Sequence, residues 1–307
     1  MTPLYVPSVL LPASLIQLNV AAFDAYKQQA LPLVADARAG LAALSASLEG
    51  WRAPESWTKR AEALRADWQK VVDRVTAPPA GNALPSDAQV LGAVNRKAGP
   101  RDIMVCAAGG LPGELHKLWR AADPKGYHLE YGFSCMGYEI AGGMGAKLAF
   151  PDRRVIVLVG DGSYLMMNSE IATAVMMGLK LDIIVLDNRG FGCINRLQQS
   201  IGDKPFNNLL ADVPGATRQA DIDFASHARS LGAEAEKVGG IAELEKALDR
   251  AARSALSHVI VIDTDPAIST REGGAWWDVP VAEVAARAEV RQAHAAYVDA
   301  VTRRDRE

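Results

Sequence analysis

The chain has 307 residues, of which 49% are hydrophobic, enough apolar sequence to bury a substantial core in about two domains. Its net charge is -3, with acidic and basic residues mixed throughout, so it has no broad basic face for nucleic acid or an anionic membrane. Three scattered cysteines argue against a disulfide framework and favour a cytoplasmic setting, and the proline-interrupted segment 1–20 is typical of neither a signal nor an anchor.

The N-terminal part of the chain is typical of the end of an α/β domain. Short apolar strands are predicted at 15–20 and 31–34, and an amphipathic helix follows at 36–48. Charged and apolar residues then alternate at helical spacing through 51–75. This order of elements predicts a partial α/β domain that ends in a long helix.

A segment rich in proline and glycine follows that helix without any periodicity, which indicates a domain boundary. Near the other end of the chain, Trp276 and Trp277 either pack the C-terminal tail or cover a ligand, and packing is the simpler interpretation. The predicted parts are the end of an α/β domain at 1–75, a linker at 76–85, a second domain at 86–270, and a C-terminal tail and helix at 271–307.

The second domain begins with Ser86 and Gln89, whose Ser-x-x-Gln spacing suits a capping box at a helix start. From there, almost continuously apolar strands alternate with helices, which indicates a parallel sheet covered on both faces. We therefore predict an α/β fold with a doubly wound parallel sheet. The expected strands are 103–106, 155–159, 181–186 and 259–262, and the expected helices are 86–97, 114–120, 136–149 and 168–177.

The central strand of this pattern runs into Gly160, Asp161, Gly162 and Ser163. Ligands of open α/β sheets bind at the carboxyl ends of strands, so the acid lies where a ligand would bind. The glycines permit close backbone approach, the amides and the Ser163 hydroxyl can meet phosphate oxygens, and the Asp161 carboxylate can hold a hard cation. By itself, however, Gly-Asp-Gly is more often an ordinary turn.

Support for a ligand site comes from the next strand, which ends at Asp187, Asn188, Arg189 and Gly190. Parallel strands deliver their ends to the same edge of a sheet, so one cation can contact both motifs. Mg²⁺ prefers oxygen ligands from carboxylates, carbonyls, water and phosphates. Asp161, the Asn188 amide oxygen and the Gly190 carbonyl therefore form a candidate partial metal shell.

The two motifs together resemble the signature of thiamine diphosphate (ThDP) enzymes, in which Gly-Asp-Gly is followed, after a helix and a strand, by Asn-Asn. Asp187 departs from this pattern at the first Asn, whereas Asn188 matches the Asn that ligates the metal. The resemblance implies a diphosphate-domain fold with thiamine diphosphate and Mg²⁺ as cofactors. It also implies cofactor contacts from Asp161, Gly162, Ser163, Asn188 and Gly190.

Upstream segments extend the resemblance to acetolactate-synthase-type enzymes. Segments 131–138 and 142–146 look like the part of that family in which a bulky apolar side chain props the bent cofactor. Met136 takes this position, although a methionine in an apolar helix is more often a plain core residue. The loop containing Gly110 is similar to one whose backbone contacts the cofactor, and Phe191 either reaches the cofactor or simply starts a helix.

Longer strings are similar to one branch of the family, the ThDP-dependent hydrolases that open a cyclic 1,2-dione in myo-inositol breakdown. These strings are 129–139, 188–198 and 273–277, and the similarity extends to 22–27 and 33–38, which resemble the end of the middle domain of that branch. The resemblance implies hydrolytic C–C cleavage of a polyol-derived substrate, trihydroxycyclohexane-1,2-dione, to 5-deoxy-glucuronate. It also implies a homo-oligomer, because active sites in the family lie between subunits.

Members of this family begin with a pyrimidine-binding domain whose Glu activates the cofactor, and no part of this sequence resembles that domain. Surface pairing or helix packing is the simpler interpretation of Glu130, Glu139 and Glu170, so no catalytic residue is identified in the chain. We expect the isolated chain to be inactive and to need a partner that supplies the pyrimidine-binding domain. The alternatives are an acetolactate-synthase-like carboligase or decarboxylase, and a truncated or split subunit without catalysis.

Overall fold

The computed structural model describes residues 15–273 and 279–306 of the chain. The predicted packing of Trp276 and Trp277 therefore falls outside the described residues, as does most of the segment 1–20. The chain divides into two compact units, one formed by residues 70–273 and the other by residues 1–69 and 274–307. None of the helices in the described parts combines the length and apolarity that a bilayer crossing requires.

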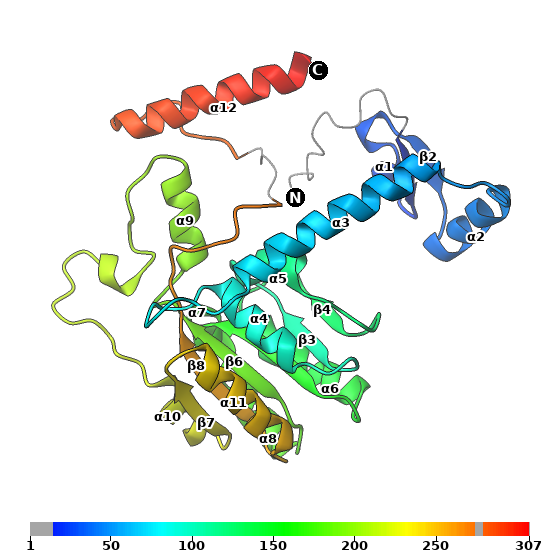
Figure 1. Ribbon diagram of the computed structural model, residues 1–307. Helices are drawn as coiled ribbons and strands as arrows, with labels where there is room; N and C mark the ends of the chain where they lie inside the picture. The colour runs from blue at the N-terminus through cyan, green and yellow to red at the C-terminus, as the bar shows by residue number, and fades with distance from the viewer. Residues whose placement is uncertain (1–14, 274–278, 307) are drawn as a thin grey trace. The chain divides into compact units, whose positions relative to one another are not determined.

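The larger unit contains the predicted parallel sheet, which has six strands in the order β4-β3-β5-β6-β8-β7 (Figure 1). All neighbouring strands pair in parallel. The fold class is therefore confirmed. The strands are β3 (Ile103–Cys106), β4 (Tyr127–Leu129), β5 (Val155–Gly160), β6 (Asp182–Asp187), β7 (Glu234–Val238) and β8 (His258–Asp263).

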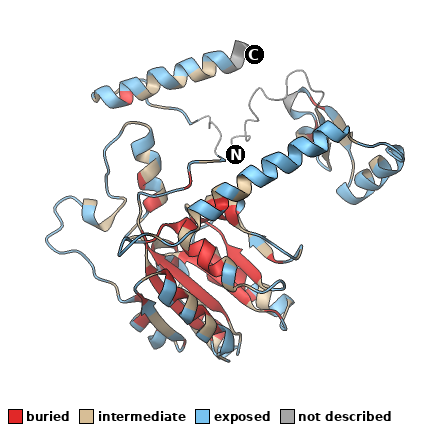
Figure 2. Cartoon of the chain, in the orientation of Figure 1, coloured by how far each residue is buried: buried red, intermediate tan, exposed pale blue. Residues whose placement is uncertain are grey.

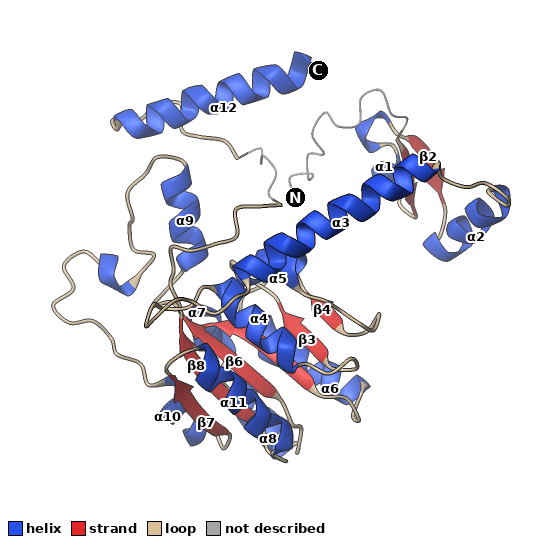
Figure 3. Cartoon of the chain, in the orientation of Figure 1, coloured by secondary structure: helices blue, strands red, loops and turns tan. Residues whose placement is uncertain are grey.

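Helices cover both faces of this sheet (Figure 3). Successive residues of β5 point to opposite faces, yet all of Val155–Val159 are at most 1% exposed. Figure 2 shows the same burial across the neighbouring strands. One face packs against α6 (Tyr138–Ala149), α7 (Asp161–Met167), α8 (Glu170–Met176) and α10 (Phe224–Ser230), and the other against α4 (Asp87–Lys97), α5 (Leu111–Leu118) and α11 (Ile241–Arg253).

Two helix starts show how local sequence sets these boundaries. The predicted capping box at the start of α4 is present, because the Gln89 amide donates to Ser86 Oγ at 3.3 Å and the Ser86 amide donates to Gln89 Oε1 at 2.9 Å. Helix α6 begins at Tyr138 rather than at Met136, because Gly137 has a left-handed φ of 91° that cannot continue a helix.

The helix predicted at 168–177 is present as α8, but a further helix that the sequence did not predict, α7, precedes it, with a break at 168–169. Helix α7 begins at Asp161, immediately after β5, so the Gly-Asp-Gly segment forms the first turn of a helix rather than a loop. The sequence prediction missed this because Gly160 and Gly162 have low helix propensity. The change matters for function, since backbone amides at a helix start are directed towards ligands.

The smaller unit contains β1 (Ile16–Asn19) and β2 (Leu31–Val34), which pair in parallel, with α1 (Ala22–Ala25), η2 (Lys27–Gln29) and α2 (Ala37–Ser47). Asp36 caps α2 by accepting a hydrogen bond from the Ala39 amide at 3.1 Å. The C-terminal helix α12 (Ala288–Arg306) is assigned to the same unit.

The division between the units falls inside α3 (Glu55–Val75), at Gln69 and Lys70, whereas the sequence placed a linker at 76–85. The end of α3 is fixed to the sheet-bearing unit because Val72 is buried and the adjoining Thr76 carbonyl accepts a hydrogen bond from Arg96 Nη1 of α4 at 3.4 Å. The following segment is fixed as well, since the Gln89 side chain donates to the Ala77 carbonyl at 2.8 Å. Segment 76–85 therefore belongs to the larger unit in this structure.

Candidate functional site

The order of the strands marks where a ligand is expected to bind. The chain passes from β3 to β4 on one side of the sheet and then returns to place β5 on the other side of β3. Open α/β sheets bind ligands in the crevice at the carboxyl ends of strands where the winding direction reverses. A pocket lies at this point, and its walls come from the segments that follow β3, β5 and β6.

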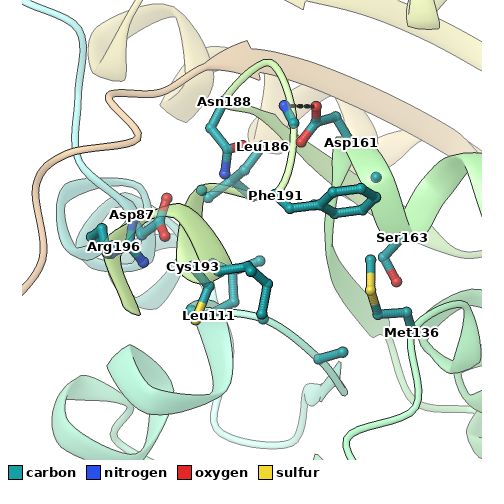
Figure 4. A pocket seen from close by; sticks show the side chains of 18 of the residues that line it. Asp87, Leu111, Met136, Asp161, Ser163, Leu186, Asn188, Phe191, Cys193 and Arg196 are labelled. Atoms are coloured by element: carbon teal, nitrogen blue, oxygen red, sulfur yellow. Dashed lines mark hydrogen bonds between the residues drawn. The ribbon is translucent and has the colours of Figure 1, made fainter. Parts of the chain in front are cut away.

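The structure brings all the site residues predicted from the sequence to this one pocket (Figure 4). They come from separate stretches of the chain, and only the fold makes them neighbours. Their roles in ligand binding stay predictions. The residues are Gly110, Met136, Asp161, Gly162, Ser163, Asn188, Gly190 and Phe191.

Asp161 lies at the junction of β5 and α7 and is only 5% exposed. Its Oδ2 accepts a hydrogen bond from the Gly190 amide at 2.7 Å, whereas its Oδ1 is buried without a hydrogen-bond partner. Burial, followed by the nearby carboxylate of Asp187, raises the pKa of Asp161 to about 7. The two acids are neighbours because the register of β5 and β6 pairs Gly160 with Leu186, the residues just before them.

Asn188 and Gly190 follow β6 on the same edge. The Asn188 Oδ1 atom is also buried without a hydrogen-bond partner. The Gly190 carbonyl accepts no hydrogen bond within the described residues. Gly190 has a φ of 146°, and a Cβ there would lie 2.4 Å from the Asn208 carbonyl oxygen, so only glycine fits this position.

These atoms fit a divalent metal ion. Two buried oxygens without protein partners, on adjacent strand ends, are costly, and a cation that ligates both would remove that cost. Carboxylate, amide and carbonyl oxygens are the ligands that Mg²⁺ takes. In the described ranges, no three or more His, Cys, Asp or Glu side chains are arranged so that they could hold a metal ion, so the remaining metal ligands would come from phosphate and water.

A buried carboxylate joins three of the segments around the pocket. Glu139 is fully buried and accepts hydrogen bonds from the Ser163 hydroxyl at 2.7 Å, the Gly137 amide at 3.1 Å and the Ala108 amide at 3.3 Å. Of the two interpretations that the sequence left open for Glu139, surface pairing is wrong, because the side chain is an internal hydrogen-bond acceptor within the packed helices. The Ser163 hydroxyl also accepts a hydrogen bond from the Gly137 amide at 2.7 Å. These hydrogen bonds within the protein compete with the predicted contact between the Ser163 hydroxyl and phosphate.

Met136 and Phe191 line the pocket on either side of Gly162. A Cβ on Gly162 would lie 2.7 Å from Phe191 Cε1 and 3.6 Å from Met136 Cε, so glycine is needed where the two side chains approach. Met136 is 37% exposed, which disfavours the alternative of a plain core methionine. Phe191 starts a helix, as one of its two predicted roles requires, because it is the N-cap of α9 (Gly192–Ser200), and it also lines the pocket, so its contact with the cofactor stays a prediction.

Sequence reasoning missed two charged residues of the pocket, Asp87 and Arg196. Asp87 is 6% exposed, and its pKa is raised to about 6, chiefly by burial. The nearby charge of Arg196 lowers the pKa of Asp87, and that of Glu114 raises it. Asp87 stands in the first turn of α4, where an acid is explained by the helix dipole alone. Its burial arises from elements distant in sequence, so no local signal could have revealed it.

Comparison with known families gives a match over residues 107–264 to the thiamine pyrophosphate enzyme, C-terminal TPP binding domain. The matched region starts directly after β3 and ends directly after β8. It therefore contains nearly every segment that lines the pocket.

Among curated proteins, the chain is 36% identical over 310 residues to the 3D-(3,5/4)-trihydroxycyclohexane-1,2-dione hydrolase of Bacillus licheniformis, which covers 92% of this chain and 48% of that protein. It is 33% identical over 317 residues to the enzyme of the same name from Bacillus subtilis, with 92% of this chain and 48% of that protein covered. The chain thus spans about half the length of the curated relatives it matches.

Among solved structures, a thiamine diphosphate-dependent 4-hydroxybenzoylformate decarboxylase from Rhodococcus jostii RHA1 superposes with a TM-score of 0.53 and 22% identity. The match covers 62% of this chain and 34% of that chain. At this identity the likeness shows the fold alone.

Proposed function

The chain belongs to the thiamine pyrophosphate enzymes, and from that premise we propose that it is the diphosphate- and Mg²⁺-binding half of a hydrolase that cleaves a C–C bond in trihydroxycyclohexane-1,2-dione to give 5-deoxy-glucuronate. The names of the curated relatives support this choice of substrate. The single observation that supports the cofactor site most directly is the pair of buried, unpartnered oxygens, Asp161 Oδ1 and Asn188 Oδ1.

In this proposal each residue of the chain has a defined task. Asp161, Asn188 and the Gly190 carbonyl hold Mg²⁺, which ties the diphosphate to the edge of the sheet. Gly162 lets the backbone of α7 approach the cofactor, and Met136 supports its rings. The cofactor, when bound, supplies the electron sink for the reaction, so the task of the protein here is anchoring, orientation and electrostatics.

The pocket does not contain an evident group for activating the cofactor. Its ionisable lining residues are Asp87, Asp161, Cys193 and Arg196, and no glutamate is among them. We therefore place the activating Glu on a complementary domain, carried by another segment or by another subunit. A surface for such a domain exists beside the pocket, where Phe133 is 84% exposed, Met166 50% and Ile194 52%.

The cofactor site is tested by calorimetric titration of the chain with ThDP, with and without Mg²⁺. We expect binding that requires the metal and that weakens by roughly tenfold or more in Asp161→Asn, because the variant keeps the size of the side chain but loses the charge that holds the cation. Asp249→Asn, an exposed acid on α11, is the matched control and should bind as the wild type does. Equal Mg²⁺-dependent binding in Asp161→Asn and wild type would contradict the proposed metal site.

The reaction is tested separately by supplying the dione or pyruvate to the same samples and following product formation. We expect the dione alone to be consumed, and only when a chain carrying the complementary domain is added. Consumption of pyruvate instead would replace the hydrolase with a carboligase. Turnover of the dione by the pure chain would show that the activating group lies within it.

A further inference from the structure

The segment that carries Met136 has no secondary structure of its own. Residues 131–137 form bends and turns between β4 and α6, outside any helix or strand. Two of its residues lie in the left-handed region, Ser134 with a φ of 53° and Gly137 with a φ of 91°. For a residue other than glycine such a backbone is costly, and it persists only where its surroundings fix it. The place of Met136 in the pocket therefore depends on partners outside the segment.

Two carboxylates supply these partners. Before the methionine in sequence, Glu130 accepts hydrogen bonds from the Phe133 amide at 3.0 Å and the Cys135 amide at 2.8 Å. After it, Glu139 accepts a hydrogen bond from the Gly137 amide at 3.1 Å. The methionine thus lies between two backbone amides that are each fixed by a carboxylate.

Glu139 differs from Glu130 because it also reaches two other walls of the pocket. Glu139 is fully buried, whereas Glu130 is partly exposed. Glu139 Oε2 accepts the Ser163 hydroxyl at 2.7 Å as well as the Gly137 amide, and Glu139 Oε1 accepts the Ala108 amide at 3.3 Å. One carboxylate therefore fixes the turn before α6, the first turn of α7 and the loop after β3 relative to one another.

Packing brings the turn before α6 into direct contact with α7. A Cβ at Gly137 would lie 2.7 Å from Met167 Cγ, and a Cβ at Gly162 would lie 3.6 Å from Met136 Cε. Figure 4 shows Met136 and Ser163 next to each other at one end of the pocket. A shift of this turn against α7 would therefore move the Met136 side chain within the pocket.

The hydrogen bonds of Ser163 leave no donor for a phosphate group. A serine hydroxyl has one hydrogen, and Ser163 donates it to Glu139 Oε2. Phosphate oxygens are strong acceptors, so a contact with the Ser163 side chain would need that same hydrogen. The arrangement favours an internal role for this hydroxyl over the phosphate contact that the sequence predicted.

We propose that Glu139 is a positioning residue that sets the place of Met136 in the pocket, and that the Ser163 hydroxyl donates to Glu139 rather than to the phosphate groups of the cofactor. The inference rests on the proposed cofactor site, in which Met136 supports the rings of the cofactor. Loss of either hydrogen-bonding group should therefore weaken the binding of the rings and leave the binding of the diphosphate unchanged.

The test compares the dissociation constants of ThDP and inorganic diphosphate, measured by calorimetric titration with Mg²⁺, in wild type, Ser163→Ala and Glu139→Gln. Inorganic diphosphate can reach the metal but has no rings for Met136 to support. We expect each variant to lose about threefold to tenfold in affinity for ThDP, the scale of a hydrogen bond, and to bind inorganic diphosphate as the wild type does. A general loss of structure would weaken the binding of both ligands.

A double-mutant cycle with Met136→Ala identifies the side chain that Glu139 positions. Met136→Ala alone should weaken ThDP binding. Adding Glu139→Gln to it should cause no further loss, because the side chain to be positioned is already absent. The cycle uses ThDP alone, so it decides between the outcomes even where wild type binds inorganic diphosphate too weakly to measure.

Glu243→Gln is the matched control, because Glu243 also accepts a backbone amide, that of Gly239 at 2.8 Å, but lies outside the pocket. It should leave both affinities unchanged. Circular dichroism and thermal melting establish that each variant is folded. If Glu139→Gln does not fold, Ser163→Ala carries both the ligand comparison and the cycle.

Three outcomes would overturn the positioning role alone: an equal loss of affinity for ThDP and inorganic diphosphate, unchanged ThDP affinity in both variants, or losses that add fully to that of Met136→Ala. In each case wild type still binds ThDP in a manner that depends on Asp161, so the proposed cofactor site stands. A wild-type chain that does not bind ThDP with Mg²⁺ would contradict the positioning role together with the proposed cofactor site.

Discussion

At the scale of single residues, the site depends on carboxylates that are kept from water. Asp161 and Asp187 stand side by side at the ends of β5 and β6, and burial raises the pKa of both. Asp187 is paired with its own loop, because its Oδ1 accepts the Arg189 amide at 3.0 Å. Asp161 keeps one oxygen without a partner, so it is the acid with capacity for a cation.

The burial of Asp87 can be tested by measuring how the stability of the protein depends on pH. Its pKa rises from 3.8 in the unfolded chain to about 6 in the folded protein, so the folded state binds the proton more tightly. The wild type therefore loses stability as the pH rises from about 4 through about 6. Asp87→Asn removes this loss and should increase the free energy of unfolding by about 1–3 kcal/mol at pH about 8, but hardly at all at pH about 4. Urea denaturation at both pH values measures the difference.

Asp249→Asn is the matched comparison, because a hydrogen bond from Lys97 lowers the pKa of Asp249. The Asp249 carboxylate therefore changes stability with pH in the opposite direction to Asp87. It stabilises the folded protein at neutral pH, and this stabilisation is lost as the pH falls below the ordinary pKa of an Asp side chain. The two variants are compared by their free energies of unfolding at neutral pH. If Asp87→Asn increases this free energy by no more than Asp249→Asn changes it, the Asp87 carboxyl is well solvated.

At the scale of elements, the core strands were predictable and the edges were not. Strands β3, β5, β6 and β8 are runs of buried apolar residues, and each was predicted to within one residue at its ends. Strands β4 and β7 were missed, because β4 has only three residues and β7 is a partly exposed edge strand with the charged sequence EAEKV. Edge strands carry polar residues, which weakens the periodicity that reveals a strand.

Helix α6 offers a paired test of packing against β5. A Cβ on Gly143 would lie 2.5 Å from Val157 Cγ2 in the buried sheet, whereas a Cβ on Gly145 would meet nothing within 4 Å. Gly143→Ala should therefore destabilise the protein by about 1–3 kcal/mol through overpacking. Gly145→Ala should stabilise it by roughly 0.5–1 kcal/mol, because alanine is the better helix former. Chemical denaturation of both variants measures these changes, and effects of the same sign would refute the proposed packing of α6.

At the scale of the whole molecule, both units leave apolar surface exposed. In the smaller unit, Phe23 is 79% exposed and Leu31 62%, so β1 and β2 have little core of their own. In the larger unit, the exposed residues near the pocket include Met166 on α7 and Leu197 on α9. Exposed apolar side chains gathered in one place are a common mark of a protein–protein interface.

We therefore predict that the chain associates with itself or with a chain that carries the complementary domain. Light scattering of the pure chain should show a mass above that of a monomer, and Met166→Glu with Leu197→Glu should reduce it, because charges at an apolar contact must be desolvated. Met176→Glu is the control, since Met176 is 79% exposed but lies at the end of α8 that leads into β6, away from the pocket edge. A monomer in every sample, with and without the complementary chain, would contradict the prediction.

The sequence by itself determined the fold class and the cofactor family, and it predicted the residues of the candidate metal motif. It could do so because these features depend on local patterns: continuous apolar runs make buried parallel strands, and the Gly-Asp-Gly and Asn motifs each follow such a run. Residue type and spacing are enough when the chemistry lies at strand ends, because a parallel sheet brings all those ends to one edge.

Only the tertiary structure decided which side chains lose water and which find partners. Asp87, Glu139 and Arg196 come from helices whose local sequence fits an ordinary capped or amphipathic surface. The burial of Asp87 and Glu139, and the partial burial of Arg196, arise where α4, α6 and α9 meet the ends of β3, β5 and β8. Desolvation depends on every neighbour in three dimensions, most of them distant in sequence. For that reason the place of the candidate metal motif at the sheet edge was predictable from the sequence, whereas the charged end of the pocket became visible only in the folded chain.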